Sequence, residues 1–218
     1  MTKTKTLYKF LRTGLKSNSG DYKWKIGEWC KEDKVDICNA GFHASKTPLQ
    51  ALSYVSGEIV AKVEVRGKSI VQDDKECWSE MRIVKAWDWE KKDSVALSIF
   101  AAEQALKNYE KAYPNDDRPR KAIEAAKKVL EADTEENRSA AWSAKSAAWS
   151  AAESAGSTAR SARSSARSAA WSAAESAAES AAWSAAKSAE SAAWSKKKLI
   201  ASLDKWFMFR IKTLTEIK

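Results

Sequence analysis

Cysteine, histidine, proline and glycine are all scarce in this sequence, and the shortages exclude several classes of protein. The 218 residues contain three cysteines, one histidine, three prolines and seven glycines. Three cysteines without a C-x-x-C pair are too few for a disulfide framework or a cysteine-rich zinc site. We therefore expect reduced thiols at Cys30, Cys38 and Cys77, and neither a metal site nor a cofactor.

Long apolar runs are also absent. No stretch of 18 or more apolar residues occurs, so the sequence predicts no membrane-spanning helix. The first five residues are polar and lysine-rich, and no apolar segment follows them, which argues against a secretory signal. With reduced thiols, these features predict a cytoplasmic protein without a membrane partner.

Basic residues outnumber acidic ones and give a formal net charge of +9. The surplus is divided between residues 1–91 and residues 196–218, and the segment between them is balanced. Nucleic-acid-binding domains usually gather their lysines and arginines on one face or stripe. The charge distribution is therefore only weak support for DNA binding.

Residues 1–91 contain short β-type runs separated by turn signals. In one run, Ile59, Ala61, Val63 and Val65 recur at every second position, the period of a half-buried strand. A short helix is predicted after Thr47, which suits the N-cap, and Pro48, which suits the first helical position. The expected strands are 7–12, 21–29, 35–44, 58–66 and 81–89.

Residues 92–218 have helical periodicity instead. A helix that starts at Asp93 or Ser94 ends before Pro114, and a second helix is capped by Asp116 or Asp117. The two are expected to form an antiparallel hairpin. Their apolar faces comprise Val95, Ile99, Ala102, Leu106, Tyr109 and Tyr113 in the first, and Ala122, Ile123, Ala126, Val129 and Leu130 in the second.

A basic amphipathic segment, residues 196–218, is expected to form a closing helix. Its apolar side comprises Leu199, Ile200, Leu203, Trp206, Phe207 and Leu214. The fold class predicted for the chain is therefore α+β. A small mixed sheet with one helix occupies residues 1–91, and an all-α helical bundle with Ala/Ser/Trp repeats occupies residues 92–218.

Residues 139–195 repeat the unit Ala-Ala-x-Ser. The mean spacing of the serines is about 3.5 residues, close to the helical period, and alanine is the best helix former. The x position holds either a charged residue or a tryptophan, so the indoles are expected at the boundary of the bundle, packed on a neighbouring helix or lining a ligand groove. The candidate binding residues in the repeat are Trp142, Trp149, Trp171, Trp183 and Trp194, with Arg160, Arg163 and Arg167 beside them.

The only histidine, His43, is the candidate catalytic residue. An imidazole at a predicted strand-to-helix turn can donate or accept a proton, or it can cap a backbone group beneath the helix. The structural role is favoured because no serine, cysteine or paired carboxylate lies nearby in the sequence. The acidic cluster Asp73-Asp74-Glu76 is interpreted as a solvated loop, not as a metal site.

Two resemblances bear on function. The segment 41–45, with Pro48, residues 51–54 and the strand end 63–67, resembles an N-terminal domain of unknown function common in phage and prophage proteins. In that family a repetitive segment often follows the domain. The segments Phe100-Ala101-Ala102-Glu103, Tyr109-Glu110, Asp117-Arg118-Pro119-Arg120 and 122–126, together with the alanine-rich repeat, are similar to an immunity-protein-like helical domain. That likeness implies inhibition by binding, and it adds Arg118 and Arg120 to the candidate binding residues.

The sequence thus favours a non-enzymatic binding or inhibitory protein, encoded by a phage or prophage. Its expected role is to counter a bacterial toxin or defence effector, or to sequester the nucleotide signal of that effector. The expected partner is a protein effector or a nucleotide-like small molecule. The alternatives are a nucleic-acid-binding protein that uses Arg160, Arg163, Arg167 and the lysines of residues 196–218, and an enzyme centred on His43. Homo-oligomerisation stays open.

Overall fold

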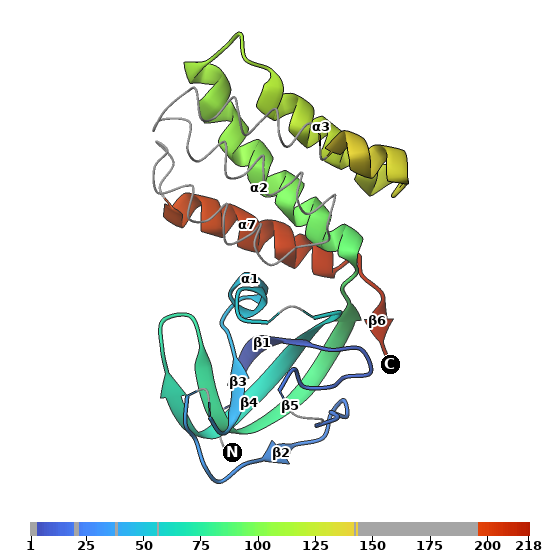
Figure 1. Ribbon diagram of the computed structural model, residues 1–218. Helices are drawn as coiled ribbons and strands as arrows, with labels where there is room; N and C mark the ends of the chain where they lie inside the picture. The colour runs from blue at the N-terminus through green and yellow to red at the C-terminus, as the bar shows by residue number, and fades with distance from the viewer. Residues whose placement is uncertain (1–3, 20–21, 38, 56, 142, 144–195) are drawn as a thin grey trace. The chain divides into compact units, whose positions relative to one another are not determined.

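The computed structural model describes residues 4–19, 22–37, 39–55, 57–141, 143 and 196–218 (Figure 1). It divides into two compact units. The first, which we call the head, comprises Met1–Trp89 and Phe207–Lys218. The second, the helical unit, comprises Glu90–Trp206. Two segments far apart in the sequence therefore build the head.

The head contains a six-stranded sheet whose named strands all pair antiparallel. Its centre is a hairpin of two long strands, β4 (Ile59–Val71) and β5 (Glu76–Asp88), and β1 (Lys5–Leu11) pairs with the first half of β4. The short strands all pair with β5; they are β2 (Cys30–Lys31), β3 (Phe42–Ala44) and β6 (Glu216–Ile217).

The sheet curls until its two sides meet. Tyr8 of β1 and Ser45, directly after β3, exchange backbone hydrogen bonds of 2.8 and 2.9 Å. The curvature is concentrated in β4, which has register shifts after Lys62 and after Arg66. At the second shift Gly67 has a φ of +88°, and a Cβ there would collide with the Ser79 hydroxyl. The closure brings β1 and β3, which the sheet order separates, to one end of the head.

Two apolar clusters stabilise the head. The first lies inside the curled sheet and consists of buried residues of β1, β4 and β5 together with Trp24, Cys30 and Ala44. The second is aromatic. The ring of Phe207 stacks on that of Trp89 with centroids 4.4 Å apart, and Phe10 meets both rings edge-on at 5.9 and 6.2 Å. Residues 207–218 are thus held in the head by Phe207 and by the pairing of β6 with β5.

The short helix α1 (Pro48–Leu52) confirms the predicted cap. The Thr47 hydroxyl oxygen accepts a hydrogen bond of 3.2 Å from the backbone N–H of Gln50, and Pro48 occupies the first turn. Pro48, Leu49, Ala51 and Leu52 are buried. The cap therefore fixes where the chain turns from β3 into α1.

The helical unit is built on α2 (Lys91–Ala112) and α3 (Arg118–Glu131). Figure 1 shows α3 running back alongside α2, as the predicted hairpin requires. Their shared core confirms most of the predicted faces, but Leu130 is 37% exposed, so its inward placement was wrong. The core residues are Val95, Ile99, Ala102, Leu106, Ile123, Ala126, Val129 and Ala141.

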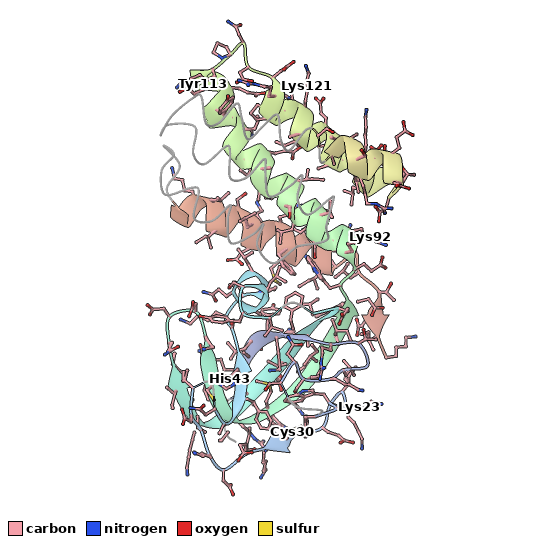
Figure 2. All side chains as sticks on the ribbon, in the orientation of Figure 1. Lys23, Cys30, His43, Lys92, Tyr113 and Lys121 are labelled. Carbon is pink, nitrogen blue, oxygen red and sulfur yellow. The ribbon has the colours of Figure 1, made fainter. Side chains whose placement is uncertain are left out.

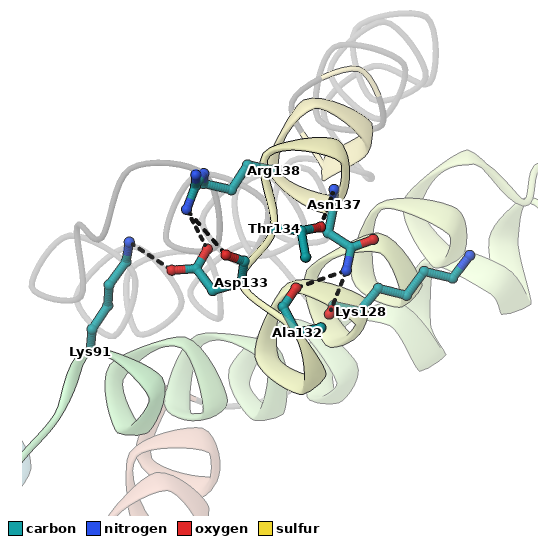
Figure 3. Close-up of polar contacts among 7 residues, drawn as sticks. All are labelled: Lys91, Lys128, Ala132, Asp133, Thr134, Asn137 and Arg138. Carbon is teal, nitrogen blue, oxygen red and sulfur yellow. Dashed lines mark hydrogen bonds and ion pairs between the residues drawn. The ribbon is translucent and has the colours of Figure 1, made fainter.

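A polar turn separates α3 from the next helical residues, 135–141 (Figure 3). The backbone N–H of Asn137 donates to the Thr134 hydroxyl at 3.1 Å, and the Asn137 amide donates to the carbonyls of Lys128 and Ala132. Asp133 accepts from Arg138 at 2.9 Å. These bonds satisfy backbone groups that a helix end leaves unpaired. The last helix, α7 (Lys196–Ile211), contributes its residues from Phe207 onward to the head.

The predicted fold class is wrong in two respects. The sheet is antiparallel, not mixed, because the long β4–β5 hairpin sets the direction of the other named strands; only an isolated bridge between Ile26 and Ile83 is parallel. The residues after 91 are not an all-α bundle, because β6 adds a strand to the sheet. A strand of two residues carries no readable period-two pattern.

Two expected strands are also largely wrong. The described residues from 22 to 29 contain only isolated bridges, and of 35–44 only β3 is a strand. Within the described residues, no helix has the length and apolar character needed to cross a membrane. Residues 144–195, which include most of the predicted repeat helices, lie outside the described part of the chain.

Candidate ligand pocket in the head

A pocket of about 410 Å³ opens in the head where β1, β3 and α1 meet. Its described lining combines three basic side chains, Lys9, His43 and Lys75, with aromatic rings, and it includes neither aspartate nor glutamate. The rings belong to Tyr8, Phe10, Tyr22, Trp24, Phe42 and Tyr54. Closure of the sheet creates this arrangement, because it brings β1 next to β3.

Lys9 lies on β1, and its ammonium group is placed among backbone and aromatic atoms. Its Nζ donates to the carbonyl oxygen of His43 at 3.0 Å and lies 6.0 Å from the centroid of the Trp24 ring. Burial lowers the pKa of Lys9 to about 8, although the charge of Cys77 acts in the opposite direction. An ammonium group that has lost part of its hydration gains more from an incoming anion than an exposed one.

His43 is in the middle of β3, opposite Cys77 of β5, so the expected strand-to-helix turn begins after it (Figure 2). Burial, followed by the positive charges of Lys9 and Lys75, lowers the pKa of His43 below its usual value. Asp36 and the Gly41 backbone oppose that shift. The imidazole is therefore mostly neutral at pH 7, and it already forms a hydrogen bond with the Gly41 backbone.

Cys77 is a candidate nucleophile that the fold places beside His43. Its thiol is fully buried and donates to the carbonyl oxygen of Ala40 at 3.1 Å. Burial raises the pKa of the Cys77 thiol. Nucleophilic cysteines have lowered pKa values and accessible sulfur atoms, so this pair is not arranged for nucleophilic chemistry.

One wall of the pocket is a rigid aromatic cluster. Trp24 is buried and donates its indole N–H to the Ser17 hydroxyl at 2.8 Å. Its ring meets those of Tyr22 and Phe42 edge-on, with centroids 5.2 and 5.3 Å apart. The Tyr22 hydroxyl donates to the sulfur of Cys30 at 2.9 Å, and this bond is the main reason that the pKa of Tyr22 rises to about 12.

Tyr54 and Lys75 also line the pocket. The ammonium group of Lys75 lies over the Tyr54 ring, 4.8 Å from its centroid, in a cation–π contact. Lys75 comes from the turn between β4 and β5, and Tyr54 follows α1. This contact holds a flexible lysine at the pocket.

Comparison with known proteins places a family at this part of the chain. Residues 5–92 match a family model described as "Domain of unknown function (DUF7666)". No curated protein and no solved structure matched the chain. The DUF7666 region contains every described residue that lines the pocket, and it stops short of residues 207–218, which complete the head.

The other predicted site residues do not join this pocket. Arg118 donates twice to Asp116, which also accepts a bond of 2.6 Å from the Tyr109 hydroxyl. Arg120 donates twice to Glu110. Both arginines thus fasten the turn between α2 and α3. The predicted binding residues of the repeat lie outside the described residues; they are Trp142, Trp149, Trp171, Trp183, Trp194, Arg160, Arg163 and Arg167.

One residue of the acidic cluster Asp73-Asp74-Glu76, which was predicted to form a solvated loop, is not in contact with solvent. Glu76 is fully buried at the start of β5, where it accepts from Lys5 at 2.6 Å and from the Trp78 indole at 3.0 Å. Among the described residues, no group of histidine, cysteine and acidic side chains is arranged to hold a metal ion. Glu76 is thus the buried partner of an ion pair whose lysine reaches the surface.

Sequence reasoning found His43 but missed its neighbours. Lys9 is one of many lysines, and nothing in its local sequence distinguishes it. Tyr22 lies in a segment that was expected to be a strand. The available signal was the density of aromatic residues between Tyr22 and Trp29, close to Ser17 and Ser19, because small-molecule sites combine aromatic side chains with a few polar groups.

Proposed function

We propose that the protein is a non-enzymatic binding protein and that the pocket of the head binds a small anionic molecule. The observation that carries the proposal is the lining itself, which combines Lys9, Lys75 and a mostly neutral His43 and has no acidic residue among its described members. Aromatic walls with a few directed polar groups are typical of small-molecule sites.

The contacts of Cys77 support binding over catalysis. Catalysis centred on His43 requires a nucleophile or a second proton-transfer group within hydrogen-bond reach. The Cys77 thiol instead donates to a backbone carbonyl and has a raised pKa. The buried thiol next to His43 therefore does not serve as a nucleophile, and this favours binding over catalysis.

Sequestration of a nucleotide-like signal is the biological role that we propose for this binding. An anionic ligand suits the two lysines, and sequestration requires no chemical step. Inhibition of a bacterial toxin or defence effector, in a phage or prophage setting, extends this proposal and rests on the family resemblances of the sequence.

Isothermal titration of the full-length protein with phosphate, pyrophosphate, adenosine monophosphate and a dicarboxylate tests the proposal. We expect at least one of these anions to bind, and Lys9→Gln and Lys75→Gln each to weaken that binding about tenfold or more, because charged hydrogen bonds contribute roughly 1.5–3 kcal/mol. Lys23→Gln, an exposed lysine outside the lining (Figure 2), is the matched control and is expected to bind like wild type. Failure of every anion to bind, or equal binding by all three variants, would overturn the proposal.

A further inference from the structure

The proposed anion pocket also contains a fixed aromatic surface that the anion alone does not use. Tyr22 is held at both ends, its hydroxyl by the sulfur of Cys30 and its ring by the edge-on contact with Trp24. Even so, 49% of the residue is exposed, and it lines the pocket. A ring that is immobilised and half open is a preorganised surface for stacking, because little further order is lost when a planar group binds to it.

The basic side chains of Lys9, His43 and Lys75 line the same pocket. The charges of Lys9 and Lys75 both act on His43, so both ammonium groups are near the imidazole. A phosphate monoester carries a charge of about −1.5 to −2 at pH 7, which two ammonium groups match. No arginine is among the described lining residues, so a phosphate bound there would be held by the lysines as point charges.

Pocket size restricts the ligand further. A volume of about 410 Å³ is near the lower end of the range of roughly 300–1,000 Å³ for small-molecule sites. It accommodates one planar ring joined to one phosphate group. A dinucleotide exceeds it.

We infer that the pocket binds a nucleoside-monophosphate-type ligand, with its planar ring stacked on Tyr22 and its phosphate held between Lys9 and Lys75 beside His43. This inference rests on the proposed function, since it specifies the anion. Tyr54 has a different part in the site: it positions Lys75 through the cation–π contact and does not stack on the ring of the ligand.

The test compares adenosine monophosphate, adenosine and inorganic phosphate by isothermal titration with the full-length protein. Wild type is expected to bind adenosine monophosphate at least tenfold more tightly than either of the others, because only that ligand uses both parts of the lining. This comparison needs no variant, so it remains decisive even if a substitution impairs folding. Equal affinity for phosphate and adenosine monophosphate would overturn the inference.

Variants at the two tyrosines separate the roles of the rings. Tyr22→Leu is expected to weaken adenosine monophosphate binding about tenfold and to leave phosphate binding unchanged, because it removes only the stacking surface. Tyr22→Phe keeps the ring and is expected to bind close to wild type. Tyr54→Leu is expected to weaken phosphate and adenosine monophosphate equally. Tyr22→Leu with unchanged nucleotide affinity would contradict the inference.

The same data distinguish this inference from the proposed function. If phosphate or pyrophosphate binds through Lys9 and Lys75 but the base adds nothing, the ring site is wrong and the anion pocket stands. If no anion binds in a lysine-dependent way, both are wrong.

Discussion

Lys9 shows how one side chain acquires its properties from the fold. In the sequence it is one of many basic residues, but closure of the sheet places its ammonium group between the His43 carbonyl and the Trp24 ring. The loss of hydration lowers its pKa to about 8, so Lys9 titrates close to neutral pH. The charge that attracts an anion is therefore itself dependent on pH.

This pKa predicts that anion binding weakens as the pH rises. Below pH 8 most Lys9 side chains are charged, whereas at pH 9 about nine in ten have lost the proton. The phosphate does not lose charge over this range, since its second pKa is about 6 and it is already mostly doubly ionised at pH 7. The affinity of wild type for adenosine monophosphate, measured by titration at pH 7 and pH 9, is expected to fall up to about tenfold. Lys9→Gln is expected to show weaker binding with little pH dependence; an equally steep fall in that variant would count against the assignment.

The buried pair of Lys5 and Glu76 predicts an asymmetry between its two partners. Glu76 is completely buried, whereas the side chain of Lys5 is 44% exposed. Lys5→Met leaves a buried carboxylate without its cation and is expected to cost about 3 kcal/mol. In Glu76→Gln, the Lys5 ammonium group can still be hydrated, and the glutamine amide oxygen can still accept from the Trp78 indole. The expected loss of stability is therefore only about 1–2 kcal/mol. Urea unfolding at pH 7 measures both.

Lys25→Gln provides the control for this pair. Lys25 forms an exposed ion pair with Glu28 at 3.3 Å. Exposed pairs contribute roughly 0–1 kcal/mol, so the urea midpoint of this variant should stay near that of wild type. Equal costs for Lys5→Met and Glu76→Gln would show that the burial of Glu76 does not determine the stability.

At the scale of elements, helices were easier to predict than strands. The spacing of Val95, Ile99 and Ala102 specified the buried face of α2. The buried residues of a helix recur every three to four positions, so a short stretch of sequence is enough to identify them. Pro48 and Thr47 likewise specified α1. The register shifts of β4 and the pairing of β6 depend on residues distant in the sequence, so no local pattern encoded them. The pocket was missed for the same reason, since its walls come from separate elements.

The turn between α2 and α3 gives a prediction at this scale. Asp116 accepts bonds from Arg118 and Tyr109, and the hydrogen bonds from Arg118 are the main reason that its pKa lies well below the usual value. A lowered carboxylate pKa stabilises the fold above the unfolded value of about 3.9, and this stabilisation is lost as the pH falls below it. Asp116→Asn is expected to lower stability by about 1–3 kcal/mol at pH 7, and by less at pH 3.

Thermal unfolding of the wild-type and Asp116→Asn proteins at the two pH values checks this expectation. Asp117→Asn is the matched control, because its ion pair with Lys121 is exposed and its side chain makes no helix-capping hydrogen bond. A difference between wild type and Asp116→Asn that is as large at pH 3 as at pH 7 would contradict the proposed role of the charge.

For the whole molecule, the main feature is that the helical unit is an insertion. The head begins with residues of the DUF7666 region and is completed by residues 207–218. The last residues contribute β6 to the sheet and Phe207 to the aromatic cluster with Phe10 and Trp89. The boundary of the matched family region is therefore not the boundary of the folded head.

Phe207 is accordingly expected to be essential for the stability of the head. Phe207→Ala removes a fully buried ring and should cost about 3–5 kcal/mol. Phe209→Ala, two residues further along, removes a ring that is 68% exposed and should change stability by less than about 0.5 kcal/mol. Urea unfolding monitored by tryptophan fluorescence compares the two variants. Equal effects would mean that residues 207–218 do not belong to the core of the head.

The divided head also sets an order of events during translation. Trp89 leaves the ribosome long before Phe207, and at about 5–20 residues per second the delay is on the order of ten seconds. During that time β5 lacks the partner that β6 later provides, and Phe10 and Trp89 lack the ring that covers them. The nascent first segment thus exposes an aromatic surface and a strand edge, both of which a chaperone can recognise, until the last residues have been synthesised.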